Sequence, residues 1–211
     1  MRIILVRHGE TRWNREHRIQ GLADLDLNET GRKQAQALAE ALRNERVSAI
    51  YTSPLRRAMD TAAAIARYHP VEMTVLDGLK ELDAGEVDGM TYDEMRENHA
   101  DFLVKWLEDC SSIRVPGGCT LQELQDQVWS AIDHIRSRHE VDEDQAVQER
   151  SIVVVAHFFP ILSILCKALS LDLSQCRRLR LGLASICTLD FNSDRIVLVS
   201  MNDTCHLKQL G

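Results

Sequence analysis

The sequence has no apolar run long enough to cross a membrane, which excludes a membrane-spanning protein. Its first apolar run, residues 2–6, ends directly on Arg7 and His8, so it is also too short for the apolar region of a secretory signal. Positive charge is not in excess: the formal net charge is -7, and a protein that binds nucleic acid needs a basic surface. We therefore expect neither a membrane nor a nucleic acid as partner.

The cysteines form no C-x-x-C pair, although there are six of them. Widely spaced cysteines in a chain without an export signal are typical of cytoplasmic proteins, in which thiols stay reduced. With 45% apolar and 27% charged residues, the composition is that of a globular protein, and 211 residues suit one domain better than two. We expect a single cytoplasmic domain over residues 1–211. Its oligomeric state, a homodimer included, stays open.

Short apolar segments that predict strands alternate with helical patterns along the chain. The expected strands are Arg2–Val6, Ala49–Tyr51, Glu72–Leu76, Ile152–Ala156, Ser185–Phe191 and Arg195–Met201. Strands that alternate with helices favour a mostly parallel sheet covered by helices on both faces. The predicted fold is a three-layer α/β/α sandwich.

Two helices between the early strands carry start signals. Asn28 or Thr30 can cap the helix that holds Ala35 and Leu38 at helical spacing. Ser53-Pro54 predicts a further helix, with serine at the N-cap and proline at the first helical position, that runs to about Tyr68.

The middle of the chain, about residues 91–139, contains no convincing strand. Two capping boxes, Thr91-x-x-Glu94 and Thr120-x-x-Glu123, indicate helices there. We expect this helical insertion to form a lid beside the ligand-binding crevice. The charged stretch from residue 139 to residue 150 is expected to be a solvated loop.

Two of the expected buried strands end on histidine: residues 2–6 lead into Arg7 and His8, and residues 152–156 lead into His157. In an open α/β sheet, ligands bind outside the carboxyl ends of the strands. Arg57, near the start of a helix, can reach the same edge. An imidazole nucleophile beside guanidinium groups suits a phosphate monoester, because its transition state is rich in negative charge.

The residues around these positions resemble the histidine phosphatase superfamily, also called the phosphoglycerate mutase-like family. The matching segments are Leu5-Val6-Arg7-His8-Gly9-Glu10-Thr11, Trp13-Asn14, Gln20-Gly21, Leu27, Gly31, Gln34-Ala35, Tyr51, Ser53-Pro54-Leu55-x-Arg57-Ala58, Thr61-Ala62, Glu81, Val154-Val155-Ala156-His157 and Asn202-Asp203-Thr204-Cys205-His206-Leu207. They span nearly the whole chain, and their ordered combination is more specific than any one motif.

The resemblance implies a role for each matching residue. His8 is the implied nucleophile, which becomes transiently phosphorylated, and Glu81 the implied proton donor. Arg7, Arg57 and His157 are implied to bind the phosphoryl group. Asn14, Gln20 and Gly21 match positions that line the phosphate or substrate side. Phe158 departs from the family, which often has glycine after the second histidine, but its backbone N–H is still expected to contact the phosphate.

The chemistry sets opposite protonation demands on two of these groups. His8 must be neutral to attack, and nearby arginines lower the pKa of an imidazole further from its ordinary value of about 6.5. Glu81 must hold a proton, although an ordinary glutamate with a pKa of about 4.3 is ionised near neutrality. The approaching substrate dianion is expected to keep that proton in place.

No metal and no cofactor are expected. Asp83, Glu86 and Asp88 form an acidic cluster, but no loop with the spacing of an oxygen-ligand site surrounds them. His134 and His139 are five residues apart, which places them on different faces of a helix.

Three branches of the superfamily offer different substrates. His157-Phe158-Phe159-Pro160 is similar to the His-x-x-Pro of cofactor-independent phosphoserine phosphatases, but Ala84 stands where those enzymes carry histidine. Pro116-Gly117-Gly118-Cys119-Thr120 resembles a segment of α-ribazole phosphatase that has glutamate in place of Cys119. Phosphoglycerate mutases are typically longer between the donor glutamate and the second histidine, and carry additional basic residues.

The sequence thus predicts a metal-independent phosphatase that hydrolyses a small phosphorylated metabolite through a phosphohistidine. Candidate substrates are phosphoserine and α-ribazole 5'-phosphate. The alternatives are a phosphoglycerate mutase and a regulatory protein that binds phosphate without catalysis, the latter favoured by Phe158, Phe159 and Cys119. Selectivity is expected to depend on the lid and on Phe158 and Phe159.

Overall fold

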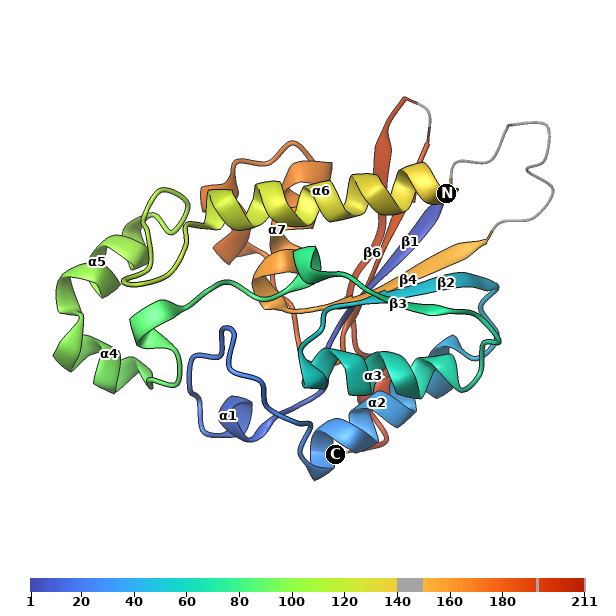
Figure 1. Ribbon diagram of the computed structural model, residues 1–211, viewed down its shortest axis with the longest axis horizontal. Coiled ribbons are helices and arrows are strands. Elements are labelled where there is room, and N and C mark those ends of the chain that lie inside the picture. The colour runs from blue at the N-terminus through green and yellow to red at the C-terminus, as the bar shows by residue number, and fades with distance from the viewer. Residues whose placement is uncertain (140–149, 193, 211) are drawn as a thin grey trace.

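The computed structural model describes residues 1–139, 150–192 and 194–210. Within these residues the chain is a three-layer α/β/α sandwich (Figure 1). The solvated loop expected between residues 139 and 150 falls almost wholly on residues 140–149, which lie outside the described residues. No helix in the described ranges is long and apolar enough to span a membrane.

The middle layer is a six-stranded sheet with the strand order β3-β2-β4-β1-β5-β6. The strands are β1 (Arg2–Arg7), β2 (Val47–Thr52), β3 (Met73–Val75), β4 (Ser151–Ala156), β5 (Ile186–Phe191) and β6 (Ile196–Asp203). Pairing is parallel from β3 to β1, and only β5 runs against the others. All six expected strands are confirmed, and the sheet is mostly parallel.

Alternation of side chains along the central strands builds two separate cores. Ile4 and Val6 of β1 pack on one face, against α2 (Glu29–Leu42) and α3 (Arg56–Ala66). Ile3 and Leu5 face the other way, against α6 (Leu121–His139) and α7 (Phe158–Ala168). Because both faces of the sheet are covered, residues 3–6 of β1 and 152–156 of β4 form unbroken apolar runs, as is typical of strands in a buried parallel sheet (Figure 1).

The observed helix starts agree with the predicted caps except at one position. Asn28 caps α2 by accepting a hydrogen bond from the N–H of Gly31, and both predicted capping boxes are formed. The prediction that Ser53 caps the next helix is wrong. Helix α3 begins at Arg56 with Leu55 at the N-cap, although Ser53 Oγ still accepts from the N–H of Leu55.

The insertion expected over residues 91–139 divides into two parts. Helices α4 (Tyr92–Asn98) and α5 (Ala100–Glu108) project beyond one end of the sheet (Figure 1). Helix α6 instead packs on α7 and belongs to the sandwich, with Leu124, Val128 and Ile132 buried in the core. Only α4, α5 and the loop that follows them lie beside the pocket described below.

The remaining short elements are α1 (Arg12–Arg15), η1 (Asp77–Leu79), η2 (Gly85–Val87), η4 (Leu173–Arg178) and η5 (Cys205–Leu207).

Candidate active site

The two histidines that follow β1 and β4 lie side by side. These strands are adjacent and parallel, with Arg7 opposite Ala156, so His8 and His157 leave the sheet at the same edge. Their ring centroids are 5.1 Å apart. Both are buried, with 3% of His8 and 0% of His157 exposed. The convergence expected from the sequence is therefore present.

The hydrogen bond made by His8 fixes its tautomer. Its Nδ1 lies 2.7 Å from the carbonyl oxygen of Gly9, which can only accept, so Nδ1 carries the proton. A neutral His8 then has its lone pair on Nε2. Gly9 is itself held in place, because its N–H donates to Thr61 Oγ1 on α3. The sequence left the attacking nitrogen open, and this contact selects Nε2.

Ser53 positions the second histidine, a role that the sequence analysis missed. Ser53 Oγ accepts from the N–H of Leu55 and lies 2.8 Å from His157 Nε2. When the serine hydroxyl donates to Nε2, the neutral imidazole keeps its proton on Nδ1, which has no partner among the described residues. Ser53 directly follows β2, the neighbour of β4, and this placement was the available signal.

Arg57 is fully buried and Arg7 is half-buried, and backbone carbonyl groups hold both side chains. Arg57 donates to the carbonyl oxygens of Ala23 and Gly21 at 2.7 and 2.8 Å, and Arg7 donates to that of Leu181 at 2.8 Å. Burial lowers the pKa of each arginine to about 10, and the Glu81 carboxylate partly offsets this effect. Both guanidinium groups remain charged at neutral pH.

The site concentrates polar atoms that have no partner. Six buried side-chain nitrogen and oxygen atoms lack a hydrogen bond within the described residues, and four of them belong to residues expected at this site. These four are Arg7 Nε, Arg57 Nε, Gln20 Nε2 and His157 Nδ1. Buried donors are rarely left unpaired in folded proteins, and exceptions point to a ligand or to bound water. All four can donate, which matches an anion.

Glu81 binds the first turn of α7. Its carboxylate accepts from the backbone N–H groups of Phe158 and Phe159 at 3.0 and 3.2 Å, and from that of Leu82 at 2.8 Å. The N–H of Phe158, which is expected to contact phosphate, therefore donates to Glu81 in this structure. A phosphate group that takes this amide must displace the carboxylate.

The pKa shifts at the site have the signs that the chemistry needs. Burial, followed by the charges of Arg57 and Arg7, lowers the pKa of His8 well below its ordinary value. The pKa of His157 is lowered in the same way, with burial the first cause. Burial raises the pKa of Glu81, although backbone N–H groups and both arginines oppose this shift. A neutral imidazole thus lies near a carboxyl group that holds its proton more firmly than an ordinary glutamate.

Asn14, Gln20 and Gly21 line a pocket of about 220 Å³ together with Arg7, His8 and Glu81. Asn14 Oδ1 accepts from the N–H of Thr11 in the capping box of α1, which leaves the Asn14 amide nitrogen for other partners. Arg57 and His157 lie deeper. They do not line this pocket, but Arg57 bonds the carbonyl oxygen of Gly21, and the His157 ring contacts that of His8.

Asp88 has a structural role in this arrangement. Its carboxylate accepts from the N–H groups of Gly21 and Ala23, the two residues whose carbonyl oxygens hold Arg57. Gly21 is required there, because an added Cβ would lie 2.7 Å from the Cβ of Ala84. Within the described ranges, no three His, Cys, Asp or Glu side chains group in a way that would hold a metal ion.

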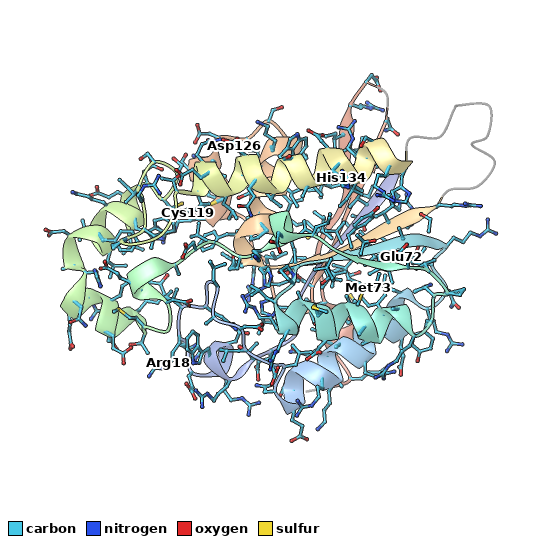
Figure 2. The ribbon with its side chains drawn as sticks, in the orientation of Figure 1. Arg18, Glu72, Met73, Cys119, Asp126 and His134 are labelled. Carbon is cyan, nitrogen blue, oxygen red and sulfur yellow. The ribbon has the colours of Figure 1, made fainter. Side chains whose placement is uncertain are left out.

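The outer part of the pocket is apolar, with Arg18 as its charged residue among those described. Arg18 follows α1 and forms an ion pair with Glu94 of α4, while Cys119 lies just before α6 (Figure 2). Burial raises the pKa of the Cys119 thiol, so it is not an activated nucleophile. The sequence analysis did not anticipate that Phe102 and Trp106 of α5 line the pocket, because their spacing also fits a helix packed on a core.

Comparison with known proteins agrees with this geometry. Residues 3–204 match the family model described as histidine phosphatase superfamily (branch 1). The chain is 34% identical over 207 residues to phosphoserine phosphatase 1 of Hydrogenobacter thermophilus, covering 98% of this chain and 94% of that protein. A phosphoserine phosphatase mutant from Entamoeba histolytica, solved in complex with phosphoserine, has a TM-score of 0.83 and 29% identity, covering 98% of each chain.

The fold is also that of a putative α-ribazole-5'-phosphate phosphatase from Escherichia coli, with a TM-score of 0.85 over 96% of each chain at 21% identity. Because the family match covers nearly the whole chain, this protein belongs to the histidine phosphatase superfamily.

Proposed function

We propose that this protein is a metal-independent phosphatase that hydrolyses a small phosphorylated metabolite through a phosphohistidine on His8. One observation carries the proposal: unpartnered buried donors gather around a histidine whose Nε2 holds a free lone pair. An anion bound there would neutralise two buried guanidinium groups and lie against a nucleophile. The names of the relatives support the same reaction class.

In the first step, the His8 Nε2 lone pair forms a bond to phosphorus while the ester P–O bond breaks. Glu81 donates its proton to the leaving alkoxide, which departs as the alcohol. In the second step, water attacks the phosphorus of phospho-His8 and the N–P bond breaks. The Glu81 carboxylate takes a proton from that water, so phosphate leaves and both residues return to their starting states.

The arginines and His157 supply the charge that the transition state needs. Arg7, Arg57 and His157 each hold a nitrogen without a partner among the described residues, and these nitrogens would bind the equatorial phosphoryl oxygens. The amide nitrogens of Asn14 and Gln20 would add neutral donors. Gly21 would act through its backbone, by allowing close approach and by fixing Arg57.

Entry of the phosphate would also prepare Glu81. The Phe158 N–H that now donates to Glu81 would turn to a phosphoryl oxygen, which removes a contact that favours the ionised carboxylate. The substrate dianion would add repulsion. Both effects raise the pKa of Glu81 further, so Glu81 is protonated when the leaving group needs a proton.

Phosphoserine and α-ribazole 5'-phosphate are the candidate substrates, since relatives with the same fold carry these names. We also propose a cytoplasmic location, which agrees with six free cysteines. That one domain spans residues 1–211 and that the chain forms a homodimer or a monomer stay predictions.

The test is His8→Ala, measured as phosphate release from p-nitrophenyl phosphate and as acid-labile, base-stable radiolabel on the protein after incubation with the ³²P-labelled ester and a denaturing quench at alkaline pH. We expect His8→Ala to lose turnover and label while retaining the native circular dichroism spectrum. His134→Ala, at an exposed position on α6, is the matched control and should retain both. Label without hydrolysis, or phosphate exchange between positions of phosphoglycerate, would indicate a mutase. Saturable binding of phosphate without label would indicate a non-catalytic binder.

A further inference from the structure

One wall of the pocket is built from aromatic rings. We define the aromatic mouth as Phe102 and Trp106 of α5 together with Phe158 and Phe159 of α7, all of which line the pocket. Phe102 and Trp106 have ring centroids 5.5 Å apart, and Trp106 meets Phe159 edge to face at 5.9 Å. The α4–α5 segment and α7 are thereby joined across the pocket.

The aromatic mouth is continuous with the phosphate end. The Phe158 and Phe159 rings are in edge contact at 5.1 Å, and the Arg7 guanidinium lies 4.9 Å from the centroid of the Phe158 ring. A group attached to a phosphate beside Arg7 would therefore meet ring surfaces first. Ile19, Met95 and Val115 extend this apolar lining.

Charged partners for a small polar alcohol are scarce in the same region. Of the described residues that line the outer pocket, Arg18 is the charged one, and it already bonds the Glu94 carboxylate at 2.9 Å and the carbonyl oxygen of Gly89 at 2.7 Å. Glu81, the nearest carboxylate in the lining, is buried and bound by backbone amides. Among the described lining residues no free carboxylate is left to pair with the ammonium group of phosphoserine, so this group would lose water without gaining an ion pair, which is unfavourable.

We propose that the substrate is a phosphate monoester whose alcohol carries a flat, apolar ring close to the ester oxygen. Phosphoserine is then not the preferred substrate. This inference rests on the proposed phosphatase function and specifies its substrate class. A ring in the aromatic mouth would bury apolar surface and gain edge and face contacts with the aromatic side chains.

The test compares three primary alkyl esters, so that leaving-group chemistry varies little: 2-phenylethyl phosphate, propyl phosphate and phosphoserine. We expect kcat/KM for the phenylethyl ester to exceed that for the propyl ester by about tenfold or more, in proportion to the apolar surface buried by the ring. Phosphoserine should be the poorest of the three. A higher kcat/KM for phosphoserine than for the phenylethyl ester would overturn the proposal while leaving the phosphatase function intact.

Two variants connect the preference to the mouth. Trp106→Ala and Phe102→Ala should each reduce the phenylethyl-to-propyl ratio by about fivefold to tenfold, as expected for the loss of one aromatic contact surface. Leu107→Ala is the matched control, because Leu107 is on the same helix, is 45% exposed and does not line the pocket. It should leave the ratio unchanged. A ratio that is unchanged in both aromatic variants would contradict the proposal.

Binding of non-hydrolysable analogues separates this inference from the function. By calorimetry, 3-phenylpropylphosphonate should bind about tenfold more tightly than butylphosphonate, and Trp106→Ala should remove the difference. Equal affinities would overturn the inference even in an active enzyme. Tighter binding of the ring without turnover of any ester would support the mouth and refute the phosphatase.

Discussion

The two ends of the pocket differ in how the fold holds them. At the phosphate end, His8 and His157 follow adjacent central strands. Arg57 is buried there and donates hydrogen bonds to two backbone carbonyl oxygens. The aromatic mouth instead combines the first turn of α7 with α5, which projects beyond the sheet (Figure 1). Chemistry that needs fixed distances is thus built on the sheet, and recognition of the alcohol is built on an inserted segment.

Electrostatics divides the pocket in the same way. Burial shifts the pKa values of His8, Arg7 and Glu81 together, because each group lies in the apolar interior near the others' charges. The aromatic mouth contributes its rings, and Arg18 in the same outer part of the pocket is already paired with Glu94. Substitutions at the phosphate end should therefore change the rate for every ester, whereas substitutions in the mouth should change the ranking of esters.

Glu81→Gln should have the largest effect among the substitutions that test this division. Loss of the general acid is expected to reduce kcat for propyl phosphate by about 10³-fold, within the range typical of such groups. The p-nitrophenolate group leaves without a proton, so p-nitrophenyl phosphate should lose much less. The measurement is kcat for both esters in both proteins. Equal losses for the two esters would show that Glu81 does not protonate the leaving group.

Arg57→Lys should lower the rate by on the order of 10²-fold, since lysine keeps the charge but cannot hold two carbonyl oxygens and a phosphoryl oxygen at once. The loss should be the same for phenylethyl and propyl phosphate. Arg56→Lys, the adjacent and exposed position, is the matched control. A change in the ratio of the two esters would contradict the separation of the phosphate end from the mouth, and thermal melting checks that the fold is retained.

The sequence predicted that His8 and His157 converge because both residues follow strand ends. Once residues 2–6 and 152–156 were recognised as buried strands of one parallel sheet, His8 and His157 had to meet. The sequence could not show which ring nitrogen of His8 is free to attack, since this depends on a hydrogen bond to the Gly9 carbonyl oxygen. The same holds for Glu81, whose carboxylate binds amides 77 and 78 positions later in the chain.

The mouth was predicted only in part. Phe158 and Phe159 were expected to affect selectivity, but Phe102 and Trp106 have the spacing of any core-facing helix. Their partner across the pocket is decided by tertiary packing. The role of Ser53 was missed for a related reason: a serine before proline suits an N-cap, but its hydroxyl also bonds the histidine that follows the neighbouring strand. Local patterns describe local hydrogen bonds and miss this tertiary contact.

The pH dependence of kcat/KM should show the two shifted groups of the phosphate end. His8 acts when neutral and its pKa is lowered, so the acid limb lies below pH 6.5. Glu81 acts when protonated and its pKa is raised, so activity falls with rising pH at a midpoint above 4.5. Beyond each midpoint the rate should change by about tenfold per pH unit.

Glu81→Gln controls for ionisation of the substrate in this profile. The ester titrates identically with both proteins, so only the limb that belongs to Glu81 should disappear in the variant. A variant that keeps the full alkaline limb of the native protein would assign that limb to the substrate and contradict the role of Glu81. Measuring phenylethyl and propyl phosphate in parallel should give the same midpoints, because the mouth adds no titrating group.

Ser53→Ala should give the smallest change in rate. Removal of the hydroxyl leaves His157 Nε2 and the Leu55 N–H without their partner, and an unpaired buried group costs about 1–3 kcal/mol of stability. Activity should fall only severalfold, since the strand end still places the ring. Ser163→Ala is the matched control: its buried hydroxyl has no partner among the described residues, so its loss should barely move the denaturation midpoint.

Because both serines are buried, equal destabilisation of the two variants would mean that the Ser53 hydroxyl does not hold His157. An equal loss of activity for phenylethyl and propyl phosphate in Ser53→Ala would place this contact, like those of Arg57, at the phosphate end.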